Sequence, residues 1–284
     1  MDAGEEVDSS LNLNSKITFM KNNFSFYVLA ICAAIVLLNS CYPGPVYDPY
    51  YIAESRQKEN VYYVTSIPNT QLLSEKNDLG FNLMRSGGSK FSGVECQASY
   101  LASKHVGLIG SYSSAGTDGG QDYMRYHQFE TGIGYITHLS KEWHFETYGG
   151  LGSGKINNTH ATGSSTINLT HFFLQPAIAV SNKNKTAQFA FVSRFAGVHF
   201  KADTAFDNDR EQFSASHIKS LYDNPFHIMW EPGIVVRFGW QNFLFHTSYS
   251  VSADLTNSNL YRANGNFSIG ASLRLNTSSK KSNQ

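Results

Sequence analysis

The chain has 284 residues, of which 22 are basic and 22 acidic, so its formal net charge is zero. This balance excludes a basic nucleic-acid-binding protein and an acidic disordered chain, because both depend on a strong charge bias. Aromatic residues make up 14% of the chain and charged residues only 15%, against about 25% charged residues in an ordinary soluble domain. So few charged side chains indicate either insertion in a membrane or a very large core.

The N-terminal part is predicted to be a leader with a signal peptide. Lys21 precedes an apolar run from Phe24 to Leu38, which is shorter than the ~20 residues of a transmembrane helix but suits a signal peptide. The run is followed by Asn-Ser and Cys41, which resembles the lipobox of bacterial lipoproteins. The resemblance implies a covalent lipid on Cys41 and a signal that starts at Met20. A secretory signal with a chance cysteine is the alternative.

The residues after the signal, 41–78, are rich in Tyr, Pro and polar residues and show no helical or strand period. We interpret them as an extended tether between the lipid and a folded domain; a binding segment that uses its tyrosines is the alternative. Tyr42 and Pro43 stand where an acidic surface-export run would follow the cysteine. We therefore expect the lipid to stay in the periplasmic leaflet of the outer membrane.

Strand candidates separated by Gly, Asn, Asp, Ser and Lys clusters fill the rest of the chain. They are predicted at about 79–85, 91–102, 105–114, 123–139, 142–154, 167–181, 186–200, 225–239, 242–254 and 265–276. Short connections alternate strictly with longer ones, such as Lys155–Thr166 and Lys201–Asn224. This alternation places all long loops at one end of an up-and-down sheet. Short periplasmic turns, long external loops and an even strand number are typical of an outer-membrane barrel.

Apolar residues alternate with small or polar residues inside these strands. Trp143, Phe145 and Leu151 share one face of their strand, whereas His144 and Glu146 share the other. A soluble barrel of the lipocalin type would bury the apolar face, and a membrane barrel would expose it. The polar face is mainly Gly, Ser and Ala, and none of the fourteen lysines falls in the predicted strands. This composition suits a narrow lumen, so we predict an all-β, up-and-down antiparallel transmembrane β-barrel of about ten strands.

Two hairpins, FETGIGYITHLSKEWHFETYGGLGSG and HFFLQPAIAVSNKNKTAQFAFVSRFAGVHF, resemble those of outer-membrane β-barrel domains in lipoproteins and porin-like proteins of Gram-negative bacteria, particularly of the Bacteroidota type. The resemblance covers about residues 65–276. It implies a location in the bacterial outer membrane, among outer-membrane lipids. The predicted organisation is a leader and signal peptide (1–40), an acylated tether (41–78), the barrel (79–276) and a polar tail (277–284).

Two motifs resemble catalytic sites, and we interpret both as structural. The glycine-rich stretch 149–155 has the spacing of a phosphate loop, but Ile156 stands where a Ser or Thr is required and no helix pattern follows. Its glycines are expected to relieve crowding in the lumen. His246 and Ser248 resemble the His-x-Ser pair of lipid A deacylases, but no Glu follows Ser248 and both residues lie on the polar face. The histidines lack metal-site spacing. We expect no enzyme, cofactor or metal site.

Charged residues on the polar face form the main candidate site. They are Glu95, Glu130, Glu146, Glu231, Arg194, Arg237 and Arg274, together with His144, His171, His227 and His246. A buried unpaired charge costs several kcal/mol, so these groups are expected to pair across the interior. We interpret them as a salt-bridged plug that keeps the barrel shut and in register. The alternative is the lining of a narrow channel or transporter for small polar solutes.

The longest predicted loop, Lys201–Asn224, is the candidate binding surface because it mixes charges with apolar anchors. We expect an external protein or saccharide partner to contact it; a lid that folds over the barrel mouth is the alternative. The candidate contact residues are Phe206, Asp207, Arg210, Phe213 and Tyr222. The sequence thus predicts a non-enzymatic protein that acts structurally or by surface binding.

Overall fold

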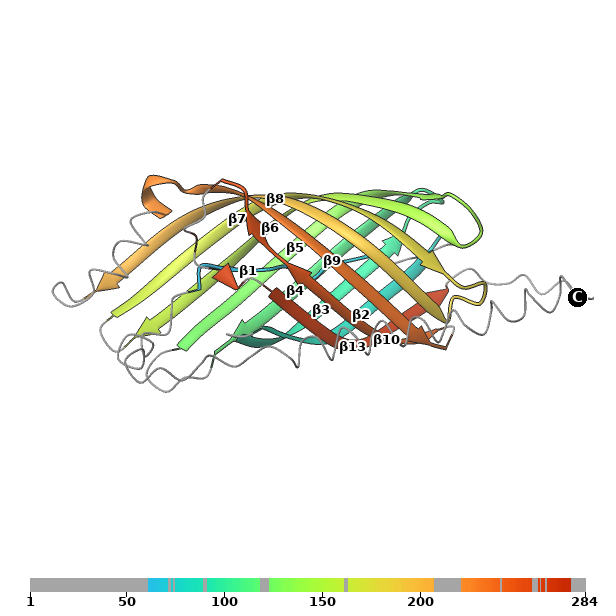
Figure 1. Ribbon diagram of the computed structural model, residues 1–284, viewed down its shortest axis with the longest axis horizontal. Coiled ribbons are helices and arrows are strands. Elements are labelled where there is room, and N and C mark those ends of the chain that lie inside the picture. Colours follow the sequence, from blue (N-terminus) through green and yellow to red (C-terminus); the bar gives the residue numbers. More distant parts are fainter. Residues whose placement is uncertain are drawn as a thin grey trace, which may run out of the picture. The chain divides into compact units, whose positions relative to one another are not determined.

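The computed structural model describes residues 61–70, 73, 75–88, 91–117, 123–160, 163–206, 221–240, 242–256, 260, 262–263 and 265–276, all within one compact unit, Lys58–Gln284. Ten long strands of this part pair in up-and-down antiparallel order (Figure 1). They are β2 (Asp78–Gly88), β3 (Phe91–Leu101), β4 (Val106–Gly116), β5 (Tyr123–His138), β6 (Trp143–His160), β7 (Gly163–Ser181), β8 (Ala187–Phe206), β9 (Phe226–Gly239), β10 (Phe243–Val251) and β13 (Gly265–Asn276). The sheet closes into a barrel because β10 pairs with both β13 and β9.

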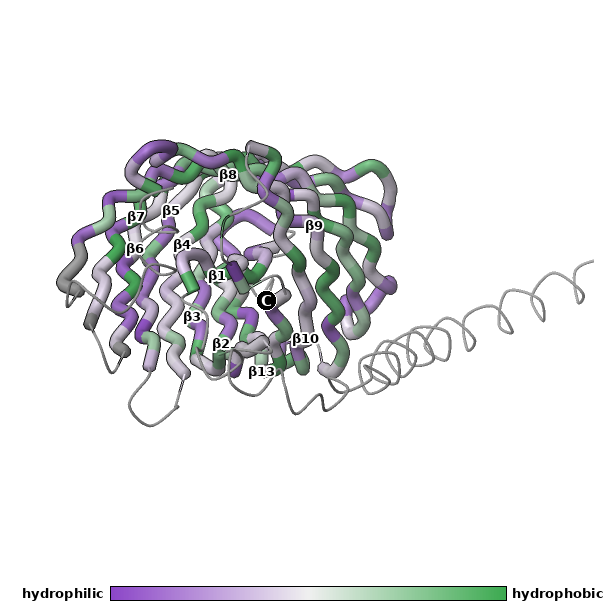
Figure 2. The backbone as a smooth tube through the Cα atoms, turned by 60° about the vertical axis from the view of Figure 1, so that its left-hand side comes forward, coloured by the Kyte–Doolittle hydropathy of each residue, from purple (hydrophilic) through white to green (hydrophobic). Residues whose placement is uncertain are grey.

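The barrel wall is apolar outside and largely polar inside. On β5, Phe129, Ile133 and Tyr135 are 54%, 59% and 50% exposed, whereas Gln128 and Glu130 are buried. Figure 2 shows this alternation of hydrophobic and hydrophilic residues along the strands. In hydrocarbon every backbone N–H and C=O needs a partner within the protein, and a closed barrel is the sheet that provides one. The predicted fold class is therefore confirmed.

Each predicted strand is present, and the largest differences lie where β6, β7 and β8 are longer than expected. The predicted loop Lys155–Thr166 instead continues the β6–β7 ladder, in which Lys155 pairs with Asn168 and Thr159 pairs with Ser164. Its Asn, Ser and Thr residues have the composition of a turn, but they also suit strands that project into water. β8 likewise continues to Phe206, which belongs to the predicted binding loop.

The two ends of the barrel differ. The short connections 102–105, 139–142 and 182–186 lie together at one end, which we call the turn end, and the opposite end is the loop end. On β6 the large apolar outward residues lie between Trp143, near the turn end, and Leu151, and the outward positions beyond Leu151 are Ser153, Lys155 and Asn157. The last part of β6 therefore projects beyond the apolar band towards the loop end.

A segment of the chain before β2 lies inside the barrel. Residues 61–70, which we call the lumen segment, are all buried, and within them β1 (Tyr63–Val64) pairs in parallel with β12 (Arg262–Ala263). Side chains from strands around the ring hydrogen-bond to this segment, among them Gln97 of β3, Gln175 of β7 and Asn266 of β13. In Figure 1 the segment runs lengthwise between the walls from β1. These residues belong to the predicted tether, yet they form part of the barrel core because VYYV at 61–64 is apolar.

The described helical residues are confined to 221–223, beside the start of β9. Within the part of the chain that the structure describes, no helix is both long and apolar enough to cross a membrane. A further two-residue strand, β11 (Ala253–Asp254), continues the path of β10 and pairs with β9.

Candidate functional site

A buried arginine joins three strands inside the lumen. Arg194 of β8 places its two terminal nitrogens 2.9 Å and 2.6 Å from the carboxylate oxygens of Glu130 on β5, and its Nε lies 3.0 Å from Glu231 Oε2 on β9. His171 Nε2 of β7 lies 2.8 Å from Glu130 Oε1. We call these four residues the arginine cluster. All four are buried, and the centre of the Phe173 ring lies 4.2 Å from the Arg194 guanidinium carbon.

The lumen segment completes the arginine cluster. The Tyr63 hydroxyl donates to Glu231 Oε1 at 3.0 Å, and the Ser66 backbone N–H donates to the same oxygen at 3.2 Å. The Ser66 hydroxyl also donates to Glu130 Oε1 at 3.2 Å. Buried carboxylates are stabilised when several donors satisfy their lone pairs, and here three of the donors come from the segment itself. The charges of the wall and the position of the segment therefore depend on each other.

A second polar group holds the other end of the lumen segment, close to the turn end. Arg237 of β9 donates to the backbone carbonyl of Thr70 and, through Nε, to His246 Nδ1 at 3.1 Å. Gln175 donates to the carbonyl of Asn69 at 3.3 Å. The segment is thus held by polar side chains at two levels of the lumen.

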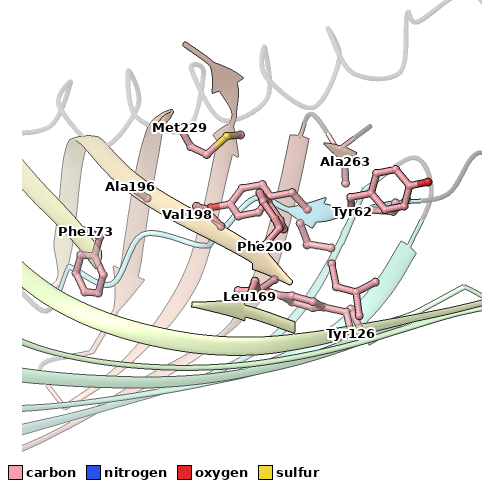
Figure 3. Close-up of a cluster of buried hydrophobic side chains, with 14 of the residues drawn as sticks. Tyr62, Tyr126, Leu169, Phe173, Ala196, Val198, Phe200, Met229 and Ala263 are labelled. Atoms are coloured by element: carbon pink, nitrogen blue, oxygen red, sulfur yellow. The ribbon is translucent and has the colours of Figure 1, made fainter. Parts of the chain in front are cut away.

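Apolar side chains surround the start of the lumen segment. The cluster in Figure 3 includes Tyr62 from the segment and inward-facing residues of β5, β7, β8 and β9. The rings of Tyr63 and Phe200 meet edge to face, with centroids 6.4 Å apart. In this half of the barrel the inner wall therefore carries a large apolar cluster beside polar residues such as Asn158, and the cluster matches the apolar start of the segment. The labelled members are Tyr62, Tyr126, Leu169, Phe173, Ala196, Val198, Phe200, Met229 and Ala263.

The glycines of the phosphate-loop-like stretch make room for large lumen side chains. A Cβ atom on Gly152 would lie 2.3 Å from His171 Nε2, and one on Gly150 would lie 2.5 Å from the tip of the Phe173 ring. Both distances are far below van der Waals contact. Gly152 therefore lets the His171 ring reach Glu130. This geometry agrees with the interpretation that these glycines relieve crowding in the lumen.

Two of the remaining predicted lumen residues pair apart from the arginine cluster. Glu95 accepts from Gln97 Nε2 at 2.6 Å, and His227 Nδ1 lies 2.8 Å from Asp254 Oδ2. Gln97 also accepts from Asn82, which accepts from Ser272, the neighbour of His246. Glu95 is thus linked by side chains to the Arg237 group rather than to the arginine cluster.

The other predicted lumen residues lie near the turn end. Arg274 binds Asp78 beside the start of β2. Glu146 and His144 are buried on the inner face of β6. These residues therefore lie on the opposite side of the arginine cluster from the apolar half of the lumen.

Several members of the site are absent from the sequence prediction. Tyr63 and Ser66 lie in the predicted tether, and Asp78 and Asp254 are the partners of two predicted charges. The signal that could have revealed the lumen segment is the inner wall itself. Apolar residues such as Phe200 share the inward parity with the charges and need an apolar partner inside the barrel.

The deacylase-like pair has other partners within the lumen. His246 Nδ1 lies 3.2 Å from Ser272 Oγ in addition to its contact with Arg237, whereas Ser248 Oγ lies 2.6 Å from Ser268 Oγ. Both side chains are buried. His246 and Ser248 are thus each engaged by a neighbouring strand.

The predicted binding loop is described only in part. Tyr222 lies in the helical turn 221–223, is 54% exposed and donates its hydroxyl to the Ala202 carbonyl at 2.9 Å. Phe206 is the last residue of β8. Asp207, Arg210 and Phe213 of this surface lie outside the described residues, as does the predicted acylation site, Cys41.

The sequence matches no protein-family model and no curated protein. Among solved structures it is similar to the translocator domain of the autotransporter NalP from Neisseria meningitidis, with 7% identity, a TM-score of 0.48 and coverage of 72% of this chain and 90% of that chain. It is also similar to the KdgM porin, with 9% identity, a TM-score of 0.34 and coverage of 69% and 99%. A third similar structure is the outer membrane protein OprD from Pseudomonas aeruginosa, with 7% identity, a TM-score of 0.24 and coverage of 76% of this chain and 98% of that chain.

These similarities concern the barrel fold alone, and the location follows from the chain's own architecture. A closed up-and-down barrel with an apolar exterior, short turns at one end and long strands and loops at the other is the form of bacterial outer-membrane proteins. The chain is accordingly a protein of the bacterial outer membrane.

Proposed function

We propose that this protein is a non-enzymatic outer-membrane lipoprotein of the Bacteroidota type, anchored by a lipid on Cys41, with a plugged barrel that acts structurally and binds partners through its external loops. The observation that carries the proposal is the lumen segment: all ten residues 61–70 are buried within the wall. A barrel that serves steady diffusion of solutes would need this space for water.

The energetics of the lumen support a plug. A ten-stranded barrel encloses little more space than an eight-stranded barrel, whose interior is filled by its own side chains. One extended segment therefore fills much of the interior. The segment is bound by the charged groups of Glu130, Glu231 and Arg237. Withdrawing it would leave two buried carboxylates with fewer donors and would expose the apolar inner wall, and both changes are unfavourable.

The loop end supports the proposed binding role. β6, β7 and β8 carry polar outward residues beyond the apolar band, including Asn157, Asn168 and Lys201, so this side of the wall projects into water. Tyr222 is exposed beside it. A rigid sheet that supports a long loop is a suitable surface for recognising a protein or a saccharide.

Conductance in planar lipid bilayers tests the plug. The full chain is expected to give little or no steady current, whereas a variant that lacks residues 61–70 and keeps its heat-modifiable gel shift is expected to conduct. Deletion of the polar tail 277–284 is the control and should leave the membrane closed. Steady current from the full chain would instead support the narrow channel for small polar solutes.

A further inference from the structure

The lumen segment has a direction. At one end the Thr70 carbonyl accepts from Arg237, which lies two residues before the last residue of β9 at the turn end. At the other end the Val61 carbonyl accepts from Asn158 Nδ2 at 3.3 Å. Asn158 lies fifteen residues beyond Trp143 on β6. The chain therefore traverses the lumen from the loop end at Val61 to the turn end, where β2 begins.

Val61 lies beyond the level of the hydrocarbon. Fifteen residues of a strand tilted by about 35–45° rise about 36–42 Å, whereas the apolar band of such barrels is about 25 Å tall. The outward neighbours of Asn158 are Asn157 and Thr159, which are polar, and the last apolar outward residue of β6 is Leu151. Two independent measures, the rise of the strand and its outward composition, thus place the start of the lumen segment outside the membrane core.

From this point the preceding chain has no return path to the turn end. The lumen is occupied by residues 61–70, which contact side chains of β3, β5, β6, β7, β9, β10 and β13. A path along the outside of the wall would carry backbone N–H and C=O groups through hydrocarbon without partners, at several kcal/mol for each group.

We infer that the chain before Val61 leaves the barrel at the loop end, so that residues 42–60 and the lipid on Cys41 lie on the external face of the outer membrane. The placement of the lipid rests on the proposed acylation, and the external side follows from the loop end facing outward. This differs from the periplasmic lipid expected from Tyr42 and Pro43. The stretch 42–60 reaches at most about 65 Å, which suffices to return from the barrel mouth to the outer leaflet.

With this topology the barrel has a specific role. It is the conduit that holds the protein's own N-terminus on the cell surface, and the contacts of Tyr63, Ser66 and Thr70 fix the chain in the conduit. Pulling the N-terminal segment back would require breaking these buried contacts together.

Epitope insertion tests the topology in the full chain. One variant carries a tag after Ser55, a second after Asp207 in the predicted external loop, and a third after Gln284, which follows β13 from the turn end. Antibody staining is compared in intact and permeabilised cells, and the heat-modifiable gel shift shows that each barrel is folded. We expect the tags at Ser55 and Asp207 to stain in intact cells and the tag at Gln284 to stain only after permeabilisation.

Other staining patterns overturn the inference. If the tag at Ser55 stains only after permeabilisation, as the tag at Gln284 is expected to do, the N-terminus lies on the periplasmic side. If the tag at Gln284 stains in intact cells and that at Asp207 does not, the barrel is inserted in the opposite sense and the lipid is not at the surface.

Trypsin treatment of intact cells tests the untagged protein. Cleavage after Arg56 or Lys58 is expected to separate a lipid-carrying N-terminal fragment from a barrel that begins at Gln57 or Glu59. Resistance in intact cells with cleavage after permeabilisation would contradict external exposure. Fatty-acid labelling of the same samples distinguishes the two proposals: a surface-exposed but unlabelled N-terminus means that the acylation fails while the topology stands.

Discussion

Arg194 and Glu130 bind each other across the barrel interior. Two strands, β6 and β7, separate β8 from β5 in the wall, yet the terminal nitrogens of Arg194 lie 2.9 Å and 2.6 Å from the two oxygens of Glu130. The pair therefore ties together parts of the wall that share no backbone ladder, and the lumen segment passes beside it through Ser66.

Replacing Arg194 by Met is expected to lower the free energy of unfolding by about 3–5 kcal/mol, because Glu130 and Glu231 would remain buried without their cation. Urea-induced unfolding of the protein in lipid vesicles, followed by tryptophan fluorescence, measures the change. Arg125→Met is the matched control. Arg125 is exposed and lies over the Tyr123 ring, so its loss should cost less than about 1 kcal/mol. Equal effects of the two variants would mean that the buried cluster contributes nothing specific.

Replacing Tyr63 by Phe tests the bond between the lumen segment and the wall. The variant removes the donor to Glu231 and is expected to destabilise the barrel by about 1–3 kcal/mol, since a buried carboxylate oxygen loses a partner. Tyr222→Phe removes a similar hydroxyl, the donor to the Ala202 carbonyl, from a half-exposed ring. Water replaces that donor, so the control should change the free energy of unfolding by less than half as much. The same unfolding measurement compares the two.

Much of the fold can be predicted from the sequence because the physics of the wall is local. Period-two alternation and turn composition identify all ten strands. In a membrane barrel the apolar face of each strand is the one that faces the lipid. The ends of β6 and β7 are missed because residues such as Asn157 and Ser164 have the composition of a loop whether or not they are paired. Above the membrane the hydrophobic pattern that marks a strand is absent.

The candidate site is predictable in composition but not in pairing. The inward parity of Arg194, Glu130 and Glu231 follows from alternation along each strand. The contact between Arg194 and Glu130 depends on how the closed wall curves around the lumen. Their spacing in the sequence gives no information about this curvature. The lumen segment is missed because its apolar part is short, from Val61 to Val64, and shows no period.

Replacing Gly152 by Ala is expected to destabilise the barrel by about 1–3 kcal/mol, because the new Cβ would lie 2.3 Å from His171 Nε2 and 2.9 Å from the Phe129 carbonyl oxygen. His171 cannot move away without losing Glu130. Gly197→Ala is the control: its Cβ would meet the ring tips of Phe172 and Phe226, which face outward and can turn into lipid. The urea midpoints of the two variants measure the difference. A stable Gly152→Ala barrel would show that the lumen is less crowded than the structure indicates.

Replacing Cys41 by Ala tests the acylation. The variant is expected to lose radiolabelled fatty acid and to retain its signal peptide, because the cysteine carries the lipid in the predicted lipobox. Cys96→Ala is the control and should keep the label, since Cys96 is an exposed residue of β3 on the outer wall. Mass spectrometry of the wild-type N-terminus gives a second readout. An unmodified mature N-terminus would refute the lipoprotein assignment.

A disulfide between Thr65 and Ser252 tests the position of the lumen segment directly. The Thr65 hydroxyl lies 2.8 Å from Ser252 Oγ, so cysteines at both positions would bring their sulfurs within bonding reach. In a Cys96→Ala background we expect Thr65→Cys/Ser252→Cys to form the bond in the oxidising envelope, and peptide mass spectrometry without reductant to detect the linked peptides. The control is Thr65→Cys/Ser272→Cys, which should not form a bond. Ser272 contacts His246 and Asn82 near the turn end rather than Thr65. Cross-linking of Thr65→Cys to both partners would mean that the segment slides in the lumen, whereas cross-linking to neither would place it outside.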